Sequence, residues 1–299
     1  MVNRTVVVLG PGAVGGSLAV RLSLAAVPIV CVARPETVGI IALSGIAVES
    51  PDGAATIRPE VAEELVRPVG LLLVTVKAPA LEEALERVSP DAVAEGVVLP
   101  LLNGLEHMEL LRKRFPGRVA AGSISHFQAY RAGRVQIIEA TRSPVITLAS
   151  EELPRGELDR VADLLRLGRM EVRVGESERR VLWSKAARLS ALAAATAASG
   201  RSVGELRDDP AWRERLLAAL DESVAVALAD GVALSAPAQW GMIAAMPPDL
   251  TTSTARDAAA GRRTELDAIT GSVVRAGARL DVPTPTLTAL LEEAACRAR

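Results

Sequence analysis

Residues 5–16 read TVVVLGPGAVGG, and residues 17–24 continue the chain as SLAVRLSL. The apolar run at 5–9 predicts a buried strand, and the largely apolar stretch after the glycines predicts a helix. In such a G-x-G-x-x-G turn the first glycine makes the bend, the second lets the backbone approach a pyrophosphate, and the third lets helix and strand pack closely. The helix N-terminus adds N–H donors for phosphates. A glycine-rich turn that binds nothing is the alternative to a dinucleotide-binding turn. The predicted contacts of the dinucleotide are Gly10, Pro11, Gly12, Ala13, Val14 and Gly15.

Further apolar runs follow along the first half of the chain. Residues 28–33 read PIVCVA, residues 71–76 read LLLVTV and residues 96–102 read GVVLPLL, with helical patterns between them. Near-continuous apolar strands are typical of a parallel sheet covered by helices on both faces. With a last strand expected at 172–174, these runs predict an open α/β domain over residues 1–175.

After this strand Ala and Leu recur at helical spacing, and no further strand is expected. The pattern predicts helices over residues 178–199, 210–230, 253–280 and 286–298. Pro283 and Pro285 separate the last two. Residues 189–198 are apolar on every side but too few to span a bilayer, which needs about 20 residues. They predict the buried central helix of an all-α second domain at 176–299.

The composition of the 299 residues excludes several classes of protein. Hydrophobic residues make up 49% and charged residues 23%, which excludes disorder, and Gly and Pro show no collagen period. Thirty-four basic and thirty-six acidic residues give a net charge of −2, so we expect no general affinity for nucleic acid or an anionic membrane. The partner that we expect is a small molecule.

Cysteine and histidine are both scarce. The sequence has only two cysteines, Cys31 and Cys296, and this usage is typical of a reducing compartment. With no targeting or membrane segment in view, it predicts a cytoplasmic protein. His107 and His126 have no carboxylate or cysteine at metal-ligand spacing beside them, so no metal site is expected.

The end of the expected second strand indicates which nicotinamide dinucleotide binds. An NAD-binding domain usually has Asp or Glu there to accept hydrogen bonds from the ribose hydroxyls, whereas this chain has Arg34. An arginine can pair with a 2′-phosphate and stack on the adenine, so Arg34 predicts NADP(H). Two observations leave an alternative open. Glu36 lies close by, and only three of the thirty-four basic residues are lysines, so Arg34 could be an ordinary solvated arginine.

Seven short motifs resemble those of ketopantoate reductases in order and spacing. They are the glycine turn at 10–16, TVKA at 75–78, LLNG at 101–104, WSK at 183–185, GELR at 204–207, TSTARD at 252–257 and RTELD at 263–267. The resemblance implies an N-terminal Rossmann domain and an all-α domain similar to the C-terminal domain of 6-phosphogluconate dehydrogenase. It also implies that NADPH delivers a hydride to the C2 carbonyl of a 2-oxo acid, and that the protein forms a homodimer.

The resemblance also assigns roles to single residues. Lys185 matches the lysine that protonates the developing alkoxide, a step that a desolvated ammonium can perform. Glu265 matches the carboxylate beside the reacting hydroxyl and the nicotinamide ribose. Asn103 matches a residue that touches both cofactor and substrate. Further expected contacts are Lys77 and Gln128 to the cofactor, and Ser253 and Asp257 to the substrate.

These assignments have plainer alternatives. Lys185 could be a helix-start lysine that reaches solvent, and Glu265 could lie on a solvated helix face beside an arginine. If one helix spans 253–280, then Ser253, Asp257 and Glu265 share an arc of about 120° and face one side. A serine four residues before an aspartate can equally be a helix cap.

The chain departs from the family where the substrate is recognised. The family helix that starts at the catalytic lysine carries asparagines one and two turns on, and a third precedes the GELR motif. The matching residues here are Leu189, Ala193 and Val203. A buried substrate group that loses its partner costs roughly 1–3 kcal/mol, so ketopantoate turnover is expected to suffer unless other side chains compensate. The candidates for compensation are Ser190, Thr196 and Ser202.

Three functions remain open from the sequence. The first is an NADPH-dependent reductase of ketopantoate or of a more apolar 2-oxo compound. The second is a related dehydrogenase of hydroxy acids or imines on the same fold. The third is a non-catalytic NADP(H)-binding sensor, against which the presence of Lys185 and Glu265 argues, since a sensor needs neither.

Overall fold

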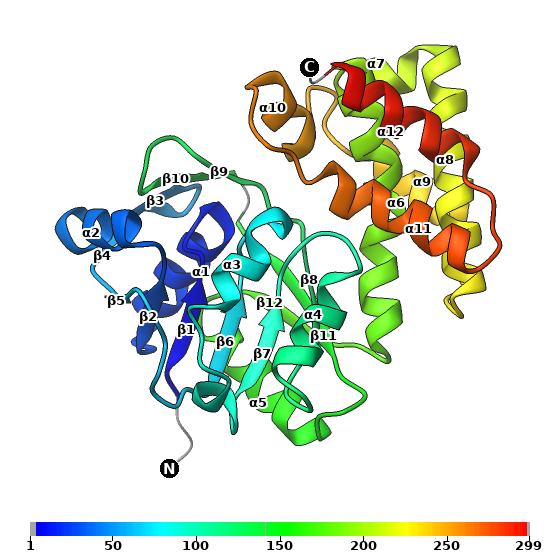
Figure 1. The fold of residues 1–299 in the computed structure, drawn as a ribbon. Helices are drawn as coiled ribbons and strands as arrows, with labels where there is room; N and C mark the ends of the chain where they lie inside the picture. The colour runs from blue at the N-terminus through cyan, green and yellow to red at the C-terminus, as the bar shows by residue number, and fades with distance from the viewer. Residues whose placement is uncertain (1–3, 141, 298–299) are drawn as a thin grey trace. The chain divides into compact units, whose positions relative to one another are not determined.

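The computed structural model describes residues 4–140 and 142–297, which form two compact units (Figure 1). The first unit comprises the chain up to Leu102 together with His107–Val181. The second comprises the short segment Asn103–Glu106 together with the chain from Leu182 onward. The boundary that we expected at 175 therefore lies close to this division, but four residues from the first half of the chain belong with the helical unit.

A five-stranded parallel sheet forms the centre of the first unit, in the order β5–β2–β1–β6–β7. The strands are β1 (Val6–Leu9), β2 (Ile29–Val32), β5 (Glu60–Ala62), β6 (Leu71–Val74) and β7 (Val97–Pro100). Every residue of β1, β2, β6 and β7 is buried, which explains why the sequence shows continuous apolar runs there. The predicted parallel sheet is confirmed. The strand order reverses at β1, so the glycine turn lies at the switch point where such sheets bind ligands.

Two smaller sheets complete the first unit, and most of their strands were not predicted from the sequence. They run in the orders β4–β3–β10–β9 and β12–β11–β8. Their strands are β3 (Ile46–Ser50), β4 (Gly53–Ile57), β8 (Ala121–Ser125), β9 (Ala129–Arg131), β10 (Gln136–Glu139), β11 (Val145–Ala149) and β12 (Glu171–Val174). The strand expected at 172–174 is β12. The helices of this unit are α1 (Ala13–Leu24), α2 (Pro35–Ser44), α3 (Leu81–Leu85), α4 (His107–Arg114) and α5 (Arg155–Arg166), with 3-10 turns at Ala78–Ala80 and Pro90–Val93.

Helix α1 packs on the parallel sheet and also on the sheet that contains β10. Gly16 allows this close approach, because a methyl group there would lie 2.4 Å from Ile137 Cδ1. The buried Glu139 carboxylate of β10 accepts hydrogen bonds from Ser17 and Arg21 of α1. The charge of Glu139 is thus paired and hydrogen-bonded, as a buried carboxylate requires. These contacts fix the helix that follows the glycine turn.

The second unit is helical, as predicted. Its elements are α6 (Glu178–Ser199, whose first residues belong to the first unit), α7 (Val203–Asp208), α8 (Pro210–Ala229), α9 (Ala236–Ala244), α10 (Ser253–Ala259), a π-helical turn (Asp267–Gly271), α11 (Ser272–Arg279) and α12 (Pro285–Arg297). Residues 191–197 of α6 are all buried, so the prediction of a buried central helix is confirmed.

The prediction of one helix over 253–280 is wrong. Helix α10 ends at Ala259, and Gly261 adopts a left-handed conformation with φ of 63°. The Arg262 amide then donates back to the Asp257 carbonyl at 2.8 Å, which closes the helix C-terminus. Ser253 and Asp257 therefore lie on a different helix from the one that follows Glu265. The expectation that all three share one helical face is wrong for the same reason.

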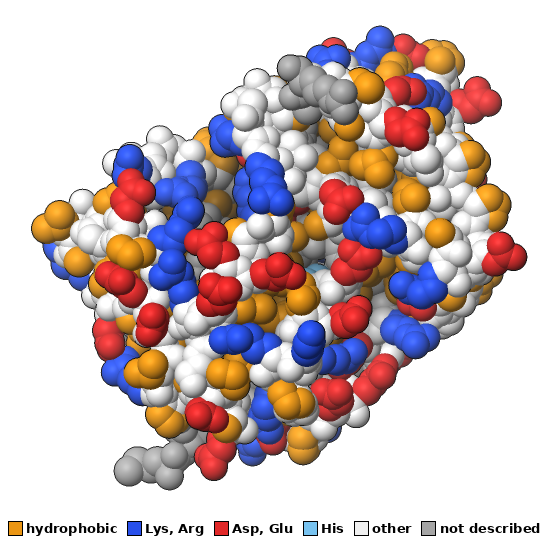
Figure 2. All heavy atoms as spheres, viewed as in Figure 1, with side chains coloured by type: hydrophobic (Ala, Val, Ile, Leu, Met, Phe, Trp, Pro, Cys, Tyr) orange, Lys and Arg blue, Asp and Glu red, His pale blue; other side chains and the backbone are white. Residues whose placement is uncertain are grey.

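The surface mixes charges of both signs. On the face drawn in Figure 2, basic and acidic side chains alternate with no large area of one sign. Within residues 4–140 and 142–297, no helix combines the length and the apolar character needed to cross a membrane.

Candidate active site

Two glycines of the glycine turn are required by the packing around them, and a third is not. Gly10 has φ of 83°, and a methyl group there would lie 2.3 Å from Val76 Cγ1. A methyl group at Gly15 would lie 2.2 Å from Thr75 Oγ1. At Gly12 the nearest atom would be the Gly10 carbonyl oxygen, at 4.0 Å. Packing therefore explains Gly10 and Gly15, whereas the open space at Gly12 fits a ligand that approaches the backbone, as a pyrophosphate does.

The hydroxyl of Thr75 holds the turn against the sheet. It donates to the Leu9 carbonyl at 3.1 Å and to the Gly10 carbonyl at 2.8 Å. Since Thr75 follows β6 directly, these bonds join the carboxyl ends of β1 and β6. The turn is therefore fixed before any ligand arrives.

The predicted cofactor contacts of three segments lie at one edge of the parallel sheet. The glycine turn follows β1, Arg34 follows β2 as the cap of α2, and Lys77 follows β6. Arg34 and Lys77 are both exposed, and Gln128, just before β9, is half-buried. Glu36, the acid that left the cofactor preference open, forms an ion pair with Arg134 from the turn between β9 and β10.

Lys185 lies on α6 in a partly desolvated setting. Two residues earlier the buried Trp183 donates from Nε1 to Asp230 Oδ2 at 2.7 Å, which anchors this turn of α6 to the end of α8. Burial lowers the pKa of Lys185 to about 8, Glu265 opposes this effect, and the charge of Arg188 adds to it. An ammonium with such a pKa can give up its proton near neutral pH.

Glu265 and Asn103 belong to the same unit as Lys185. Glu265 is buried, and its carbonyl accepts from the Ile269 amide at 2.9 Å, where the π-helical turn begins. Thr270 of that turn donates to the Ser190 carbonyl of α6 at 2.9 Å, so the turn is fixed to the helix that carries Lys185. Turns of π-helix occur frequently at functional sites.

The segment Asn103–Glu106 is held against the π-helical turn. Gly104 has φ of 91°, and a methyl group there would lie 2.0 Å from the Ala268 carbonyl oxygen. Arg275 donates to both carboxylate oxygens of Glu106, from Nε at 2.8 Å and from Nη2 at 2.7 Å. The structure thus brings Asn103 to the element that follows Glu265. The Glu106–Arg275 pair had not been predicted; the one local signal near it was the glycine at 104, a residue type that permits a close backbone approach.

The two predicted substrate contacts on α10, Ser253 and Asp257, lie near residues other than Lys185. Thr252, not Ser253, caps α10, and its hydroxyl contacts Thr196 Oγ1 at 2.7 Å. Thr196 lies eleven residues after Lys185, about 16 Å along the helix axis. Ser253 is exposed at this distant end, and the buried Asp257 forms an ion pair with Arg262 at 2.9 Å. The structure does not bring Ser253 next to Lys185.

The positions of the three absent asparagines are apolar, as the sequence indicated. Ala193 and Val203 are fully buried in the core of the helical unit, and Leu189 packs against that core. The hydroxyls that were candidates for compensation are engaged within the protein. Their partners are Ser223 for Ser190 (2.9 Å), Thr252 for Thr196, and the Glu205 amide for Ser202 (3.4 Å).

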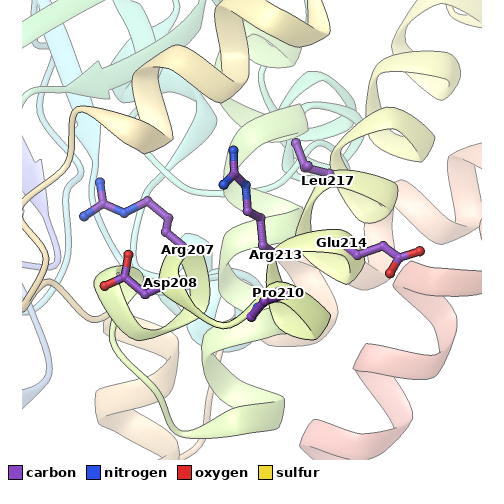
Figure 3. Close-up of a pocket in the computed structure, with 6 residues that line it drawn as sticks. All are labelled: Arg207, Asp208, Pro210, Arg213, Glu214 and Leu217. Atoms are coloured by element: carbon purple, nitrogen blue, oxygen red, sulfur yellow. The ribbon is translucent and has the colours of Figure 1, made fainter.

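A surface groove of about 300 Å³ lies on α7 and α8, and none of the predicted site residues lines it (Figure 3). Its lining residues are Arg207, Asp208, Pro210, Arg213, Glu214 and Leu217. Arg207 donates to the carbonyls of Ala244 and Met246, and the Arg213 guanidinium lies 5.6 Å from the centre of the Trp240 ring. Both arginines therefore serve to hold α9.

The remaining titratable groups do not suggest a different chemistry. In the described ranges, no three His, Cys, Asp or Glu side chains are grouped so that they could hold a metal ion. His107 is buried at the start of α4, and His126 is exposed after β8. Burial in β2 raises the pKa of the Cys31 thiol to about 12, so this cysteine is an inert core residue.

Comparisons with known proteins identify the family of this chain. The sequence profile described as "Ketopantoate reductase PanE/ApbA" matches residues 6–150, and the one described as "Ketopantoate reductase PanE/ApbA C terminal" matches residues 178–296. The 2-dehydropantoate 2-reductase of Caulobacter vibrioides is 31% identical over 97% of this chain and 99% of that protein.

Solved structures show the same fold. The PanE/ApbA family ketopantoate reductase of Ralstonia eutropha has a TM-score of 0.87 at 26% identity, with 98% of each chain covered. A D-mandelate dehydrogenase, solved with NADH and anilino(oxo)acetate, has a TM-score of 0.90 at 20% identity, again with 98% of each chain covered. From the two profile matches and the Caulobacter relative, we conclude that this chain belongs to the ketopantoate reductase family, whose members are oxidoreductases.

Proposed function

We propose that this protein reduces 2-oxo acids with an apolar substituent, using NADPH, and that Lys185 supplies the proton. The observation that carries the proposal is the setting of Lys185: a half-buried lysine beside Glu265, with its pKa lowered to about 8, on the helix where the family has its catalytic lysine. Reduction of a carbonyl needs a hydride and a proton, and these come from different sources.

The first unit would hold the cofactor. The turn Gly10–Gly15 would bind the pyrophosphate, Arg34 the 2′-phosphate, and Lys77 and Gln128 would contact the remainder. The open space at Gly12 supports this assignment. When bound, NADPH supplies the hydride.

The second unit would supply the acid. As the carbonyl carbon becomes tetrahedral, the charge on its oxygen is stabilised by the Lys185 ammonium, which then transfers its proton to that oxygen. Glu265 stabilises the charged form of Lys185 and so keeps the lysine a proton donor at neutral pH. Asn103, held by the Gly104 and Glu106 contacts, would orient the carbonyl with its amide.

The apolar residues on α6 and at the start of α7 support an apolar substrate. Leu189 stands one turn beyond Lys185, where the family presents an asparagine, and Ala193 and Val203 offer no hydrogen bond. A polar hydroxyl of ketopantoate would lose its partners there. The D-mandelate dehydrogenase of the same fold, solved with anilino(oxo)acetate, illustrates that this fold can bind a bulky 2-oxo acid.

The experiment that tests the function measures NADPH oxidation with ketopantoate, pyruvate and phenylglyoxylate. We expect kcat/KM for phenylglyoxylate to exceed that for ketopantoate at least about tenfold, because two or more buried hydrogen bonds are absent. A preference for ketopantoate would overturn the substrate assignment. No turnover of any 2-oxo acid, with NADPH or NADH, would overturn the reductase.

Replacing Arg34 by alanine tests the cofactor preference. The change is expected to weaken NADPH binding by about 10- to 100-fold, the loss of a charge-assisted contact, and NADH binding far less. Fluorescence titration of both dinucleotides measures this. Arg67→Ala removes another exposed arginine, paired with Glu60, and should change neither affinity. Equal losses for NADPH and NADH in Arg34→Ala would refute the assignment.

A further inference from the structure

Arg188 is a cation one helical turn beyond Lys185, in none of the motifs that relate the chain to its family. Residues three apart on a helix share a face. The guanidinium is held from α9, where Nη1 donates to Gln239 Oε1 at 2.8 Å and lies 3.2 Å from Met242 Sδ. Gln239 is buried, so the acceptor end of this anchor is fixed in the protein interior.

Only one edge of this guanidinium is used. Within the described part of the chain, the hydrogen bonds of Arg188 all start from Nη1, the third going to the Ser184 carbonyl at 3.4 Å. Nε and Nη2 are therefore available for a ligand. Together these two atoms form the edge that matches a carboxylate with two parallel hydrogen bonds.

We propose that Arg188 binds the carboxylate of the 2-oxo acid through Nε and Nη2 and so selects acids over neutral carbonyl compounds. The inference rests on the proposed function. In a 2-oxo acid the carboxylate is bonded directly to the reacting carbonyl carbon, so its cation must lie within a few ångströms of the proton donor. Arg188 lies one helical turn from Lys185, close enough for its charge to act on that lysine. Ser253, in contrast, stands on a helix joined to α6 about 16 Å beyond Lys185.

The same contact would prepare Lys185 for proton transfer. In the free protein the charge of Arg188 lowers the pKa of Lys185, while Glu265 raises it. A bound carboxylate offsets the charge of Arg188 and so favours the ammonium form. The substrate thereby stabilises the protonation state that its own reduction requires.

The test compares phenylglyoxylate with its methyl ester, which has the same carbonyl but no anionic carboxylate. In Arg188→Gln, kcat/KM for the acid is expected to fall about 10- to 100-fold, and kcat/KM for the ester less than threefold. Arg180→Gln is the matched control, because Arg180 is an exposed arginine of the same helix, 3.6 Å from Glu176. It should leave both values unchanged. Arg188→Lys should restore part of the lost activity, since lysine returns the positive charge but cannot donate two parallel hydrogen bonds from a planar group.

A binding measurement separates this inference from the proposed function. Calorimetry with oxamate, an unreactive carboxylate analogue, should show binding to the NADP⁺ complex of the wild type and at least about tenfold weaker binding to that of Arg188→Gln. Equal oxamate affinities of the wild type and Arg188→Gln would overturn the role of Arg188 but not the reductase activity. Equal losses of kcat/KM for the acid and the ester in Arg188→Gln would have the same meaning. A wild type that reduces no 2-oxo acid would overturn the proposed function itself.

Discussion

Lys185→Ala is expected to lower kcat for 2-oxo acid reduction by roughly 10²- to 10⁴-fold, the usual contribution of a positioned general acid. NADPH affinity should change little, because Lys185 acts on the substrate oxygen. Stopped-flow measurement of the hydride-transfer step checks this directly. Lys113→Ala, an exposed lysine on α4, serves as the control and should retain wild-type kcat.

The pH dependence supplies a second readout for Lys185. With a pKa of about 8, the lysine is protonated below that pH and neutral above it. The kcat/KM for reduction should therefore be constant at lower pH and fall as pH rises through about 8, whereas oxidation of the 2-hydroxy acid should rise over the same range. In Lys185→Ala this transition should disappear. A variant with wild-type kcat and an unchanged profile would show that the proton comes from another group.

Two alanine substitutions in the glycine turn should affect different properties of the protein, one its stability and the other its affinity for NADPH. Gly15→Ala places a methyl group 2.2 Å from Thr75 Oγ1 and 2.7 Å from the Gly10 carbonyl oxygen, so the free energy of unfolding should fall by about 3 kcal/mol. Gly12→Ala meets no atom closer than 4.0 Å and should keep wild-type stability within about 1 kcal/mol. Its NADPH affinity should nevertheless fall at least about tenfold, because the methyl group occupies the space of the pyrophosphate.

Chemical denaturation and NADPH titration of the same two variants provide the comparison. Each variant is the control for the other, since both add one methyl group to the same turn. If Gly12→Ala bound NADPH as tightly as the wild type, the space above Gly12 would not be the phosphate site. If Gly15→Ala were as stable as the wild type, the turn would be free to adjust, and packing would not explain its glycines.

The parts of the fold that could be predicted are those whose burial repeats regularly along the chain. The strands β1, β2, β6 and β7 are buried throughout, so continuous apolar runs marked them. Short strands such as Ala129–Arg131 have no such pattern, because two of its three residues are exposed. The single helix expected at 253–280 is interrupted at Gly261, which adopts a left-handed conformation. A glycine after three alanines is a signal for a helix end that can be read from the sequence.

The candidate site could be predicted only where motifs marked it. Lys185 stood out as one of three lysines, but Arg188 is one of many arginines, and its separation from Gln239 by 51 positions hides their contact. The Glu106–Arg275 pair spans 169 positions. Such contacts depend on tertiary packing, and no local preference of the chain encodes them.

The placement of Asn103–Glu106 with the helical unit limits how the protein can be divided. An N-terminal fragment cut at residue 175 would carry Gly104 and Glu106 without Ala268 and Arg275, and the complementary fragment would lack them. The same holds for gene fusions between relatives. A chimera that replaces only the C-terminal half would leave Glu106 without Arg275, so residues 103–106 should be exchanged together with that half.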